Sequence, residues 1–152
     1  MNAAGLEGIV AGQTAVCSIT GTLLYRGYDV ATPAAGADFE EVAHLLLHGE
    51  LPTRTQLDAF RERLSAAYGL PASVVDAVRA IPRKAPLMDV MRSACSLIAH
   101  HDPDVDDNSR AAELRKAERL VAQLPIGLAT TMRLRSGRQP GMLDGDAGSG
   151  KH

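Results

Sequence analysis

Residues 23–29 are Leu-Leu-Tyr-Arg-Gly-Tyr-Asp, and this stretch does most to indicate how the chain folds. It follows a β-prone segment at residues 15–19, Ala-Val-Cys-Ser-Ile, and the intervening Thr20-Gly21-Thr22 has the composition of a turn. We therefore predict a small β-hairpin over about residues 8–30. The next segment, Ala-Thr-Pro-Ala-Ala-Gly-Ala at residues 31–37, breaks the pattern and is predicted to form a loop.

Helix-capping signals follow this loop. Asp38 stands three residues before Glu41, and Thr53 stands three residues before Gln56, which is the spacing of a capping box. Gly49 matches the left-handed residue that often ends a helix, because glycine adopts that conformation with little strain. These signals predict one helix between Asp38 and Gly49 and a second helix that begins after Thr53.

Three further helices are predicted downstream. Pro71 and Pro86 suit helix starts, because a proline in the first turn lacks only a donor that would be unpaired there. A long fifth helix is predicted over residues 109–135, and Pro125 inside it is expected to kink it or divide it in two. The fold class is therefore all-α, a multi-helix protein with a small β-hairpin near the N-terminus.

Composition agrees with a soluble globular protein. Hydrophobic residues make up 45% of the 152 and charged residues 22%, while aromatic residues make up only 3%, so the core must be mainly aliphatic. Leu57, Phe60, Leu64 and Ala67 recur at helical spacing and predict the buried face of one helix. We predict a helical region over residues 1–136, with the hairpin at about 8–30, and a flexible glycine-rich tail over 137–152.

Several classes of function are disfavoured by the bulk properties. The formal charge of −2 gives no basic face for nucleic acid. No apolar run approaches the length needed to cross a bilayer, and the first residues do not resemble a secretory signal. Cys17 and Cys95 lie far apart and form no CxxC pair, so we expect two reduced thiols and a cytoplasmic protein.

The tail nearly matches a phosphate-binding loop. Residues 145–151, Gly-Asp-Ala-Gly-Ser-Gly-Lys, have the glycines and the lysine of that motif. His152 stands where the motif has serine or threonine, no strand precedes the loop, and no helix follows it in this sequence. We therefore interpret the segment as a glycine-rich terminus rather than a nucleotide site.

Two polar clusters are candidate metal sites. His44 and His48 lie four apart on one predicted helix, but a zinc site needs a third protein ligand that the sequence does not supply. Residues 102–107 are rich in aspartate but lack the glycine and the glutamate of a calcium loop. We predict a partly buried His44, a helix-end His48 and a solvated loop between helices. His100, His101 and Asp102 give no nucleophile elbow for a serine triad.

Arg26 lies in a short Tyr-Arg-Gly-Tyr turn and has two interpretations. Its guanidinium could bind a ligand carboxylate through two parallel hydrogen bonds. Alternatively, it pairs with an acid such as Asp29 and fastens the hairpin to the helices. We favour the second interpretation.

Taken in order, these segments resemble a known family. The segments are Gly5–Gly12, Leu24–Asp29, Phe39–Gly49, Leu51–Thr53 and Pro86–Arg92. Each is weak alone, but their order and spacing over residues 5–140 are similar to the amino-terminal part of the citrate synthase and 2-methylcitrate synthase family.

The resemblance implies an all-helical, dimeric enzyme of the tricarboxylic acid cycle type that joins acetyl-CoA or propionyl-CoA to oxaloacetate. In that family an aspartate removes the proton α to the thioester, histidines stabilise the enol and polarise the ketone, and arginines hold the carboxylates. This chemistry needs a base and an electrophile that neutralises developing charge, and it requires no metal or other cofactor.

The family's catalytic segments are not found in residues 1–152. No residue is therefore assigned a catalytic, cofactor-binding or metal-binding role, and we expect the chain to be inactive alone. A truncation, a frameshift or an expressed fragment would each explain this, and the sequence does not decide which acyl-CoA the family enzyme uses. The alternative hypothesis is a non-catalytic helical module that binds itself or a full-length synthase through apolar faces.

Overall fold

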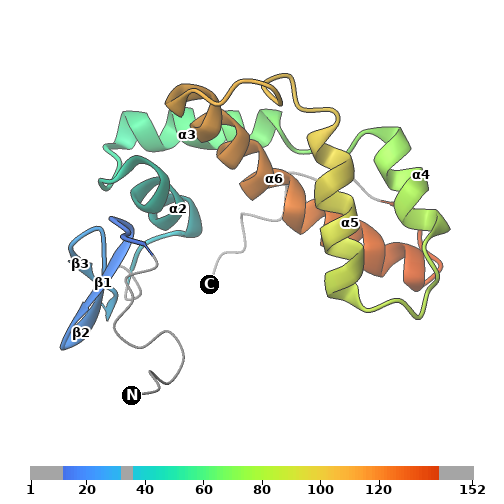
Figure 1. Ribbon diagram of the computed structural model, residues 1–152, viewed down its shortest axis with the longest axis horizontal. Coiled ribbons are helices and arrows are strands. Elements are labelled where there is room, and N and C mark those ends of the chain that lie inside the picture. Colours follow the sequence, from blue (N-terminus) through green and yellow to red (C-terminus); the bar gives the residue numbers. More distant parts are fainter. Residues whose placement is uncertain (1–11, 32–35, 141–152) are drawn as a thin grey trace, which may run out of the picture. The chain divides into compact units, whose positions relative to one another are not determined.

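The computed structural model describes residues 12–31 and 36–140 (Figure 1). The chain divides into two compact units, Met1–Asp58 and Ala59–His152, and each is described by itself. None of the helices in the described part of the chain is both long and apolar enough to cross a membrane.

The first unit begins with a three-stranded antiparallel sheet. Its strands are β1 (Cys17–Thr20), β2 (Thr22–Tyr25) and β3 (Tyr28–Asp29), arranged in that order. The predicted hairpin is confirmed as the β1–β2 pair, and residues 8–11 of the predicted range lie outside the described residues. The third strand was not predicted, so the expected hairpin is one strand short of the sheet.

The turn before β3 explains the extra strand. Arg26 and Gly27 both have positive φ, +50° and +90°, and Tyr25 pairs with Tyr28 across them. Two central residues with positive φ form the type I′ turn, whose twist matches that of two antiparallel strands. This turn therefore returns the chain alongside β2 instead of releasing it into a loop.

Helix α2 (Phe39–His48) begins and ends at the predicted signals. The Glu41 carboxylate accepts a hydrogen bond from the Asp38 N–H at 2.8 Å. Gly49 has φ +97° and donates its N–H to the Leu45 carbonyl at 2.8 Å. Both the acidic capping arrangement and the glycine stop are confirmed.

Helix α3 (Arg54–Ala66) opens with the predicted capping box. Gln56 Oε1 accepts a hydrogen bond from the Thr53 N–H at 2.8 Å, and Thr53 Oγ1 accepts one from the Gln56 N–H at 3.4 Å. The helix crosses the boundary between the two units. Its predicted apolar stripe is buried at Leu57, Phe60 and Leu64.

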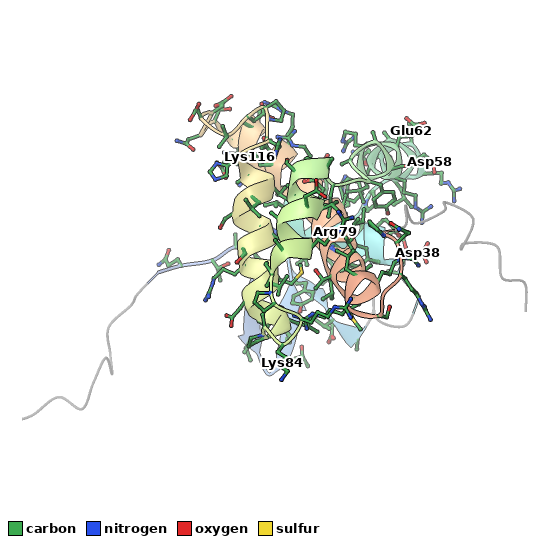
Figure 2. The ribbon with its side chains drawn as sticks, turned by 90° about the vertical axis from the view of Figure 1, so that its right-hand side faces the viewer. Asp38, Asp58, Glu62, Arg79, Lys84 and Lys116 are labelled. Atoms are coloured by element: carbon green, nitrogen blue, oxygen red, sulfur yellow. The ribbon has the colours of Figure 1, made fainter. Side chains whose placement is uncertain are left out.

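The second unit contains three further helices, which pack against one another (Figure 1). They are α4 (Ala72–Ala80), α5 (Leu87–Ala99) and α6 (Arg110–Arg135). Lys84, in the loop before α5, and Lys116, in the second turn of α6, lie at opposite ends of this helical group (Figure 2). The predicted starts are confirmed, with Pro71, Pro86 and Ser109 as the N-cap residues.

Pro125 does not divide α6, so that part of the prediction is wrong. The helix continues from Arg110 to Arg135 through the proline. A proline inside a helix removes one hydrogen bond and costs about 3 kcal/mol. Ile126 and Gly127, directly after it, are buried, and the packing of this turn offsets the loss.

The core is aliphatic, as the composition predicted. In the second unit, buried Val78, Val90 and Ala94 form one cluster, against which Ile81, Ala85 and Leu134 pack. Phe60 is the one aromatic side chain among the buried hydrophobic residues of the described chain.

The two phenylalanines give a matched test of this core. Phe60 is 0% exposed and Phe39 is 66% exposed. Truncating a buried phenylalanine removes apolar contacts and leaves a cavity, so Phe60→Ala should lower the free energy of unfolding by about 3–5 kcal/mol. Urea unfolding followed by circular dichroism measures this change. Phe39→Ala should stay within about 0.5 kcal/mol of the parent, and equal effects of the two variants would contradict the assigned core.

Candidate functional site

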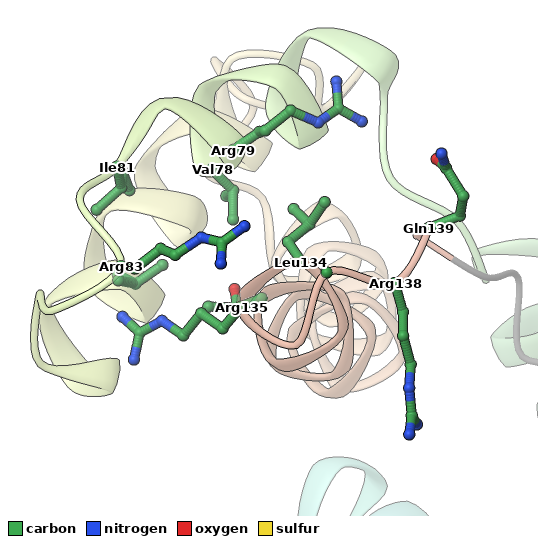
Figure 3. Close-up of a pocket in the computed structure, with 11 residues that line it drawn as sticks. Val78, Arg79, Ile81, Arg83, Leu134, Arg135, Arg138 and Gln139 are labelled. Carbon is green, nitrogen blue, oxygen red and sulfur yellow. The ribbon is translucent and has the colours of Figure 1, made fainter.

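The second unit contains a hollow of about 490 Å³ where α4, the loop before α5 and the end of α6 meet (Figure 3). Four of its lining residues are arginines, so we call it the arginine hollow. Its full lining is Val78, Arg79, Ile81, Arg83, Val90, Thr131, Leu134, Arg135, Gly137, Arg138 and Gln139.

The end of α6 positions one side of the arginine hollow. Gly137 has φ +75° and donates its N–H to the Leu134 carbonyl at 3.1 Å, while the Arg138 N–H donates to the Arg133 carbonyl at 2.9 Å. Arg133 Nε in turn donates to the Gln139 carbonyl at 2.8 Å. The chain therefore turns back over the last turn of the helix, because glycine permits the left-handed conformation needed there.

Sequence reasoning missed the arginine hollow. Arg79 and Arg135 lie in the last turns of α4 and α6, where cations interact favourably with the helix dipole. Arg83 follows α4 and Arg138 follows α6. Basic residues at two predicted helix ends were the available signal, but nothing in the sequence indicates that those two ends meet.

Arg26 fastens β2 to α2, although not through the predicted acid. Its Nη2 and Nε donate to the Leu46 carbonyl at 2.7 and 3.2 Å, and its Nη1 donates to the Ala15 carbonyl at 3.3 Å. The Asp29 carboxylate instead accepts a hydrogen bond from the Ala31 N–H at 2.9 Å. The fastening role is supported, and the pairing with Asp29 is wrong.

His44 and His48 stack on each other, with ring centroids 4.4 Å apart. His44 is 5% exposed, and its Nδ1 lies 3.1 Å from the Glu50 carbonyl oxygen. The helix-end position of His48 is confirmed, and His44 is more deeply buried than the predicted partly buried position. Within the described ranges, no group of three histidine, cysteine or acidic side chains is placed to hold a metal ion.

The loop predicted to be solvated is instead held by ion pairs. Arg119 donates to Asp102 at 2.6 and 2.8 Å and to Asp104 at 2.6 Å, and Arg115 donates to Asp104 at 2.6 and 3.0 Å. The Asp102 and Asp104 side chains are only 10% and 17% exposed. The prediction failed because the two arginines that pair with these aspartates lie on the next helix.

These hydrogen bonds change the acidity of the carboxyls. Those from Arg119 hold the pKa of Asp102 below its ordinary value, against an opposing effect of burial. Those from Arg115 and Arg119 hold the pKa of Asp104 well below its usual range. Both aspartates are therefore charged at neutral pH, as parts of a structural contact.

Two further features considered from the sequence are the histidines near residue 101 and the glycine-rich segment at residues 145–151. His101 Nε2 lies 2.9 Å from the Ser73 hydroxyl, and no acid is recorded on the other ring nitrogen in the described part of the chain. This serine–histidine pair therefore lacks the acid that a catalytic triad requires. The glycine-rich segment at residues 145–151 lies outside the described residues.

A second hollow, of about 300 Å³, lies in the first unit. Glu41 is its one charged lining residue, and this carboxylate is already bound to the Asp38 N–H. The other lining residues are Tyr28, Gly36, Ala37, Leu45, Leu51 and Pro52. Neither hollow brings a histidine and an acid together.

Comparison with known proteins identifies the family. A family model described as "Citrate synthase, C-terminal domain" matches residues 5–149. The chain is 41% identical over 128 residues to the 2-methylcitrate synthase of Shewanella oneidensis, covering 82% of this chain and 33% of that protein.

Solved structures agree with this match. The citrate synthase of Pyrobaculum aerophilum aligns with a TM-score of 0.80 and 29% identity, over 89% of this chain and 37% of that one. The citrate synthase of Thermoplasma acidophilum, solved as a ternary complex with carboxymethyl coenzyme A and oxaloacetate, aligns with a TM-score of 0.79 and 25% identity, over 88% and 36%.

The mostly helical fold with a small antiparallel sheet is therefore that of part of a citrate synthase. The chain belongs to the citrate synthase family, which confirms the resemblance inferred from the ordered segments. It spans about a third of the length of the curated relatives that it matches.

The ion-paired loop gives a pH-dependent prediction. A carboxyl whose pKa is lowered on folding stabilises the protein above its unfolded pKa of about 3.9 and loses that contribution as the pH falls through its native pKa. Asp102→Asn should thus be about 2 kcal/mol less stable than the parent at pH 7, because hydrogen bonds to charged groups contribute about 1.5–3 kcal/mol. This difference should shrink below about pH 4, as measured by urea unfolding across pH.

Asp89→Asn provides the control. Asp89 pairs with Arg92 on an exposed face of α5, where the two side chains are 52% and 79% exposed. Such surface pairs contribute about 0–1 kcal/mol. A difference for Asp102→Asn that is the same at all pH values, or no larger than that of Asp89→Asn, would contradict the role given to Asp102.

Proposed function

We propose that this chain forms the amino-terminal scaffold of a citrate or 2-methylcitrate synthase-type enzyme, which condenses an acyl-CoA with oxaloacetate. We also propose that the chain is inactive when it is alone. The observation that carries the second statement is that neither of the two hollows described above is lined by a histidine or an aspartate. Family membership supports the first statement.

The chemistry explains why this observation matters. A condensation at the carbon next to a thioester needs a base near the C–H bond and a donor that stabilises the developing oxyanion. In the described chain, His44 lies against the Glu50 carbonyl and His101 against the Ser73 hydroxyl. The aspartates Asp102 and Asp104 are held by arginines. These groups act in folding contacts, which supports the proposal that the reacting groups come from elsewhere.

The direct test is release of free CoA. Purified chain should give no thiol release from acetyl-CoA or propionyl-CoA with oxaloacetate, because no acid and imidazole face each other in either hollow. Cys17 and Cys95 are free thiols and would react with a thiol reagent, so each assay is compared with one lacking oxaloacetate. Oxaloacetate-dependent release, reproduced in independent preparations, would overturn the proposal.

The second candidate function is self-association through the α5–α6 face. Met88 on α5 is 78% exposed, and Met132 and Leu128 on α6 are 55% and 38% exposed. Met91 follows Met88 by one turn of α5. Its Cε lies 3.9 Å from the point that a Cβ at Gly127 would occupy, so α5 and α6 are close to each other at Met91 and Gly127. Exposed apolar side chains on two neighbouring helices support a protein interface here. The dimeric assembly implied by the resemblance would be formed here.

Light scattering after size exclusion tests this proposal. The parent chain should be a dimer, and Met88→Glu/Met132→Glu should be a monomer, because two charges cannot be buried without partners. Val105→Glu is the control, since Val105 is 47% exposed and lies in the loop between the helices. A monomeric parent, or a Val105→Glu variant that dissociates equally, would count against this interface.

A further inference from the structure

Arg26 occupies a backbone conformation that residues other than glycine adopt only rarely. Its φ is +50°, and it is the one non-glycine residue with positive φ in the described part of the chain. With Gly27 it forms the centre of the type I′ turn between β2 and β3, where asparagine, aspartate and glycine are strongly preferred. The left-handed conformation costs free energy in a residue that has a Cβ. An arginine at this position indicates that the side chain contributes something that the turn itself does not require.

The Arg26 side chain joins the sheet to the C-terminal end of α2. Nε and Nη2 donate to the Leu46 carbonyl at 3.2 and 2.7 Å, and Nη1 donates to the Ala15 carbonyl at 3.3 Å. Leu46 lies in the last turn of α2, where the carbonyl groups lack donors within the helix. A cation at this end of a helix also interacts favourably with the helix dipole. One guanidinium thus caps α2 and ties it to the segment that leads into β1.

The sheet itself buries little apolar surface. Among the strand residues whose exposure the structure describes, none is buried, and Ile19 and Leu23 are 80% and 39% exposed. Towards α2, Tyr28 and Leu45 line the hollow of about 300 Å³, so apolar contact is incomplete there. A small sheet is stable only with a packed apolar face or with a helix against it. Arg26 supplies the directional contact with such a helix.

We propose that β1, β2 and β3 form a strap that the Arg26 guanidinium holds against α2, and that this strap opens while the helices stay folded. The buried hydrophobic residues of the described chain all lie in helices, so the sheet adds none to the core. Regions with few buried apolar contacts open at a lower free energy than the whole fold. The three guanidinium hydrogen bonds raise that free energy, and they account for an arginine at a strained position. The strap is a property of the folded chain, and its test requires no enzymatic activity.

Hydrogen–deuterium exchange of the whole chain, followed by mass spectrometry, tests the strap. Arg26→Asn removes the guanidinium and supplies a residue that the type I′ turn prefers, so the turn is kept and the fastening is lost. Amides of β1 and β2 should then exchange at least about tenfold faster, because one hydrogen bond from a charged group contributes enough for that factor. Amides of α6 should keep the rate of the parent chain, since α6 is held by ion pairs to other residues.

Two results would overturn the proposal. If Arg26→Asn leaves the exchange of β1 and β2 unchanged, the guanidinium does not hold the sheet. If the amides of α6 accelerate as much as those of β1 and β2, the sheet does not open separately from the helices.

Two further variants isolate the paired hydrogen bonds. Arg26→Lys keeps the charge and loses the paired geometry, so it should accelerate exchange of the sheet by less than Arg26→Asn does. Arg54→Gln is the matched control in the same unit, because Arg54 is 81% exposed and pairs with Asp58 on the surface of α3. Such a pair contributes little, so the exchange of the sheet should not change. Equal acceleration by Arg54→Gln and Arg26→Asn would also overturn the proposal, as would an Arg26→Lys variant with the exchange rate of the parent chain.

Discussion

The contact between the loop aspartates and α6 sets the arrangement of the second unit. Asp102 and Asp104 are bound by Arg115 and Arg119, which lie one turn apart on the helix. Aliphatic packing is non-directional and allows helices to slide, whereas paired guanidinium–carboxylate bonds fix both distance and orientation. The ion pairs therefore fix the first half of α6 relative to the loop that follows α5. Further along the same helix, Leu134 packs against the apolar cluster.

A second ion pair starts from the same turns of α6. Glu118 is 7% exposed and accepts hydrogen bonds from Arg63 of α3 at 2.7 and 3.1 Å. A charge this buried is stable only with a partner. Residues 110–119 thus carry the ion pairs to α3 and to the preceding loop, whereas the later turns carry apolar contacts and the hydrogen bond from Arg135 to the Ala85 carbonyl. The arginine hollow forms where the apolar part ends and the chain turns at Gly137.

Local signals predicted the elements, while contacts between distant residues were not predictable. Gly49 and the Thr53–Gln56 pair act within a few residues, so their sequence pattern was enough to place two helix boundaries. The Asp102–Arg119 pair spans 17 residues, and nothing in the aspartate-rich segment indicates which distant cation it meets. The same holds for the arginine hollow, whose lining comes from residues 78–90 and 131–139. The β3 strand was predictable, because the Tyr-Arg-Gly-Tyr turn before it is a local signal within four residues.

The continuous course of α6 through Pro125 has a mechanical consequence. Proline has no N–H, so the Val121 carbonyl lacks its usual helical donor. Upstream of this gap, the helix is fastened by ion pairs, which acid neutralises. Downstream of it, the helix is fastened by apolar packing, which salt scarcely weakens and denaturants do. One helix thus joins two segments that yield to different stresses, and the proline lies at the junction between them.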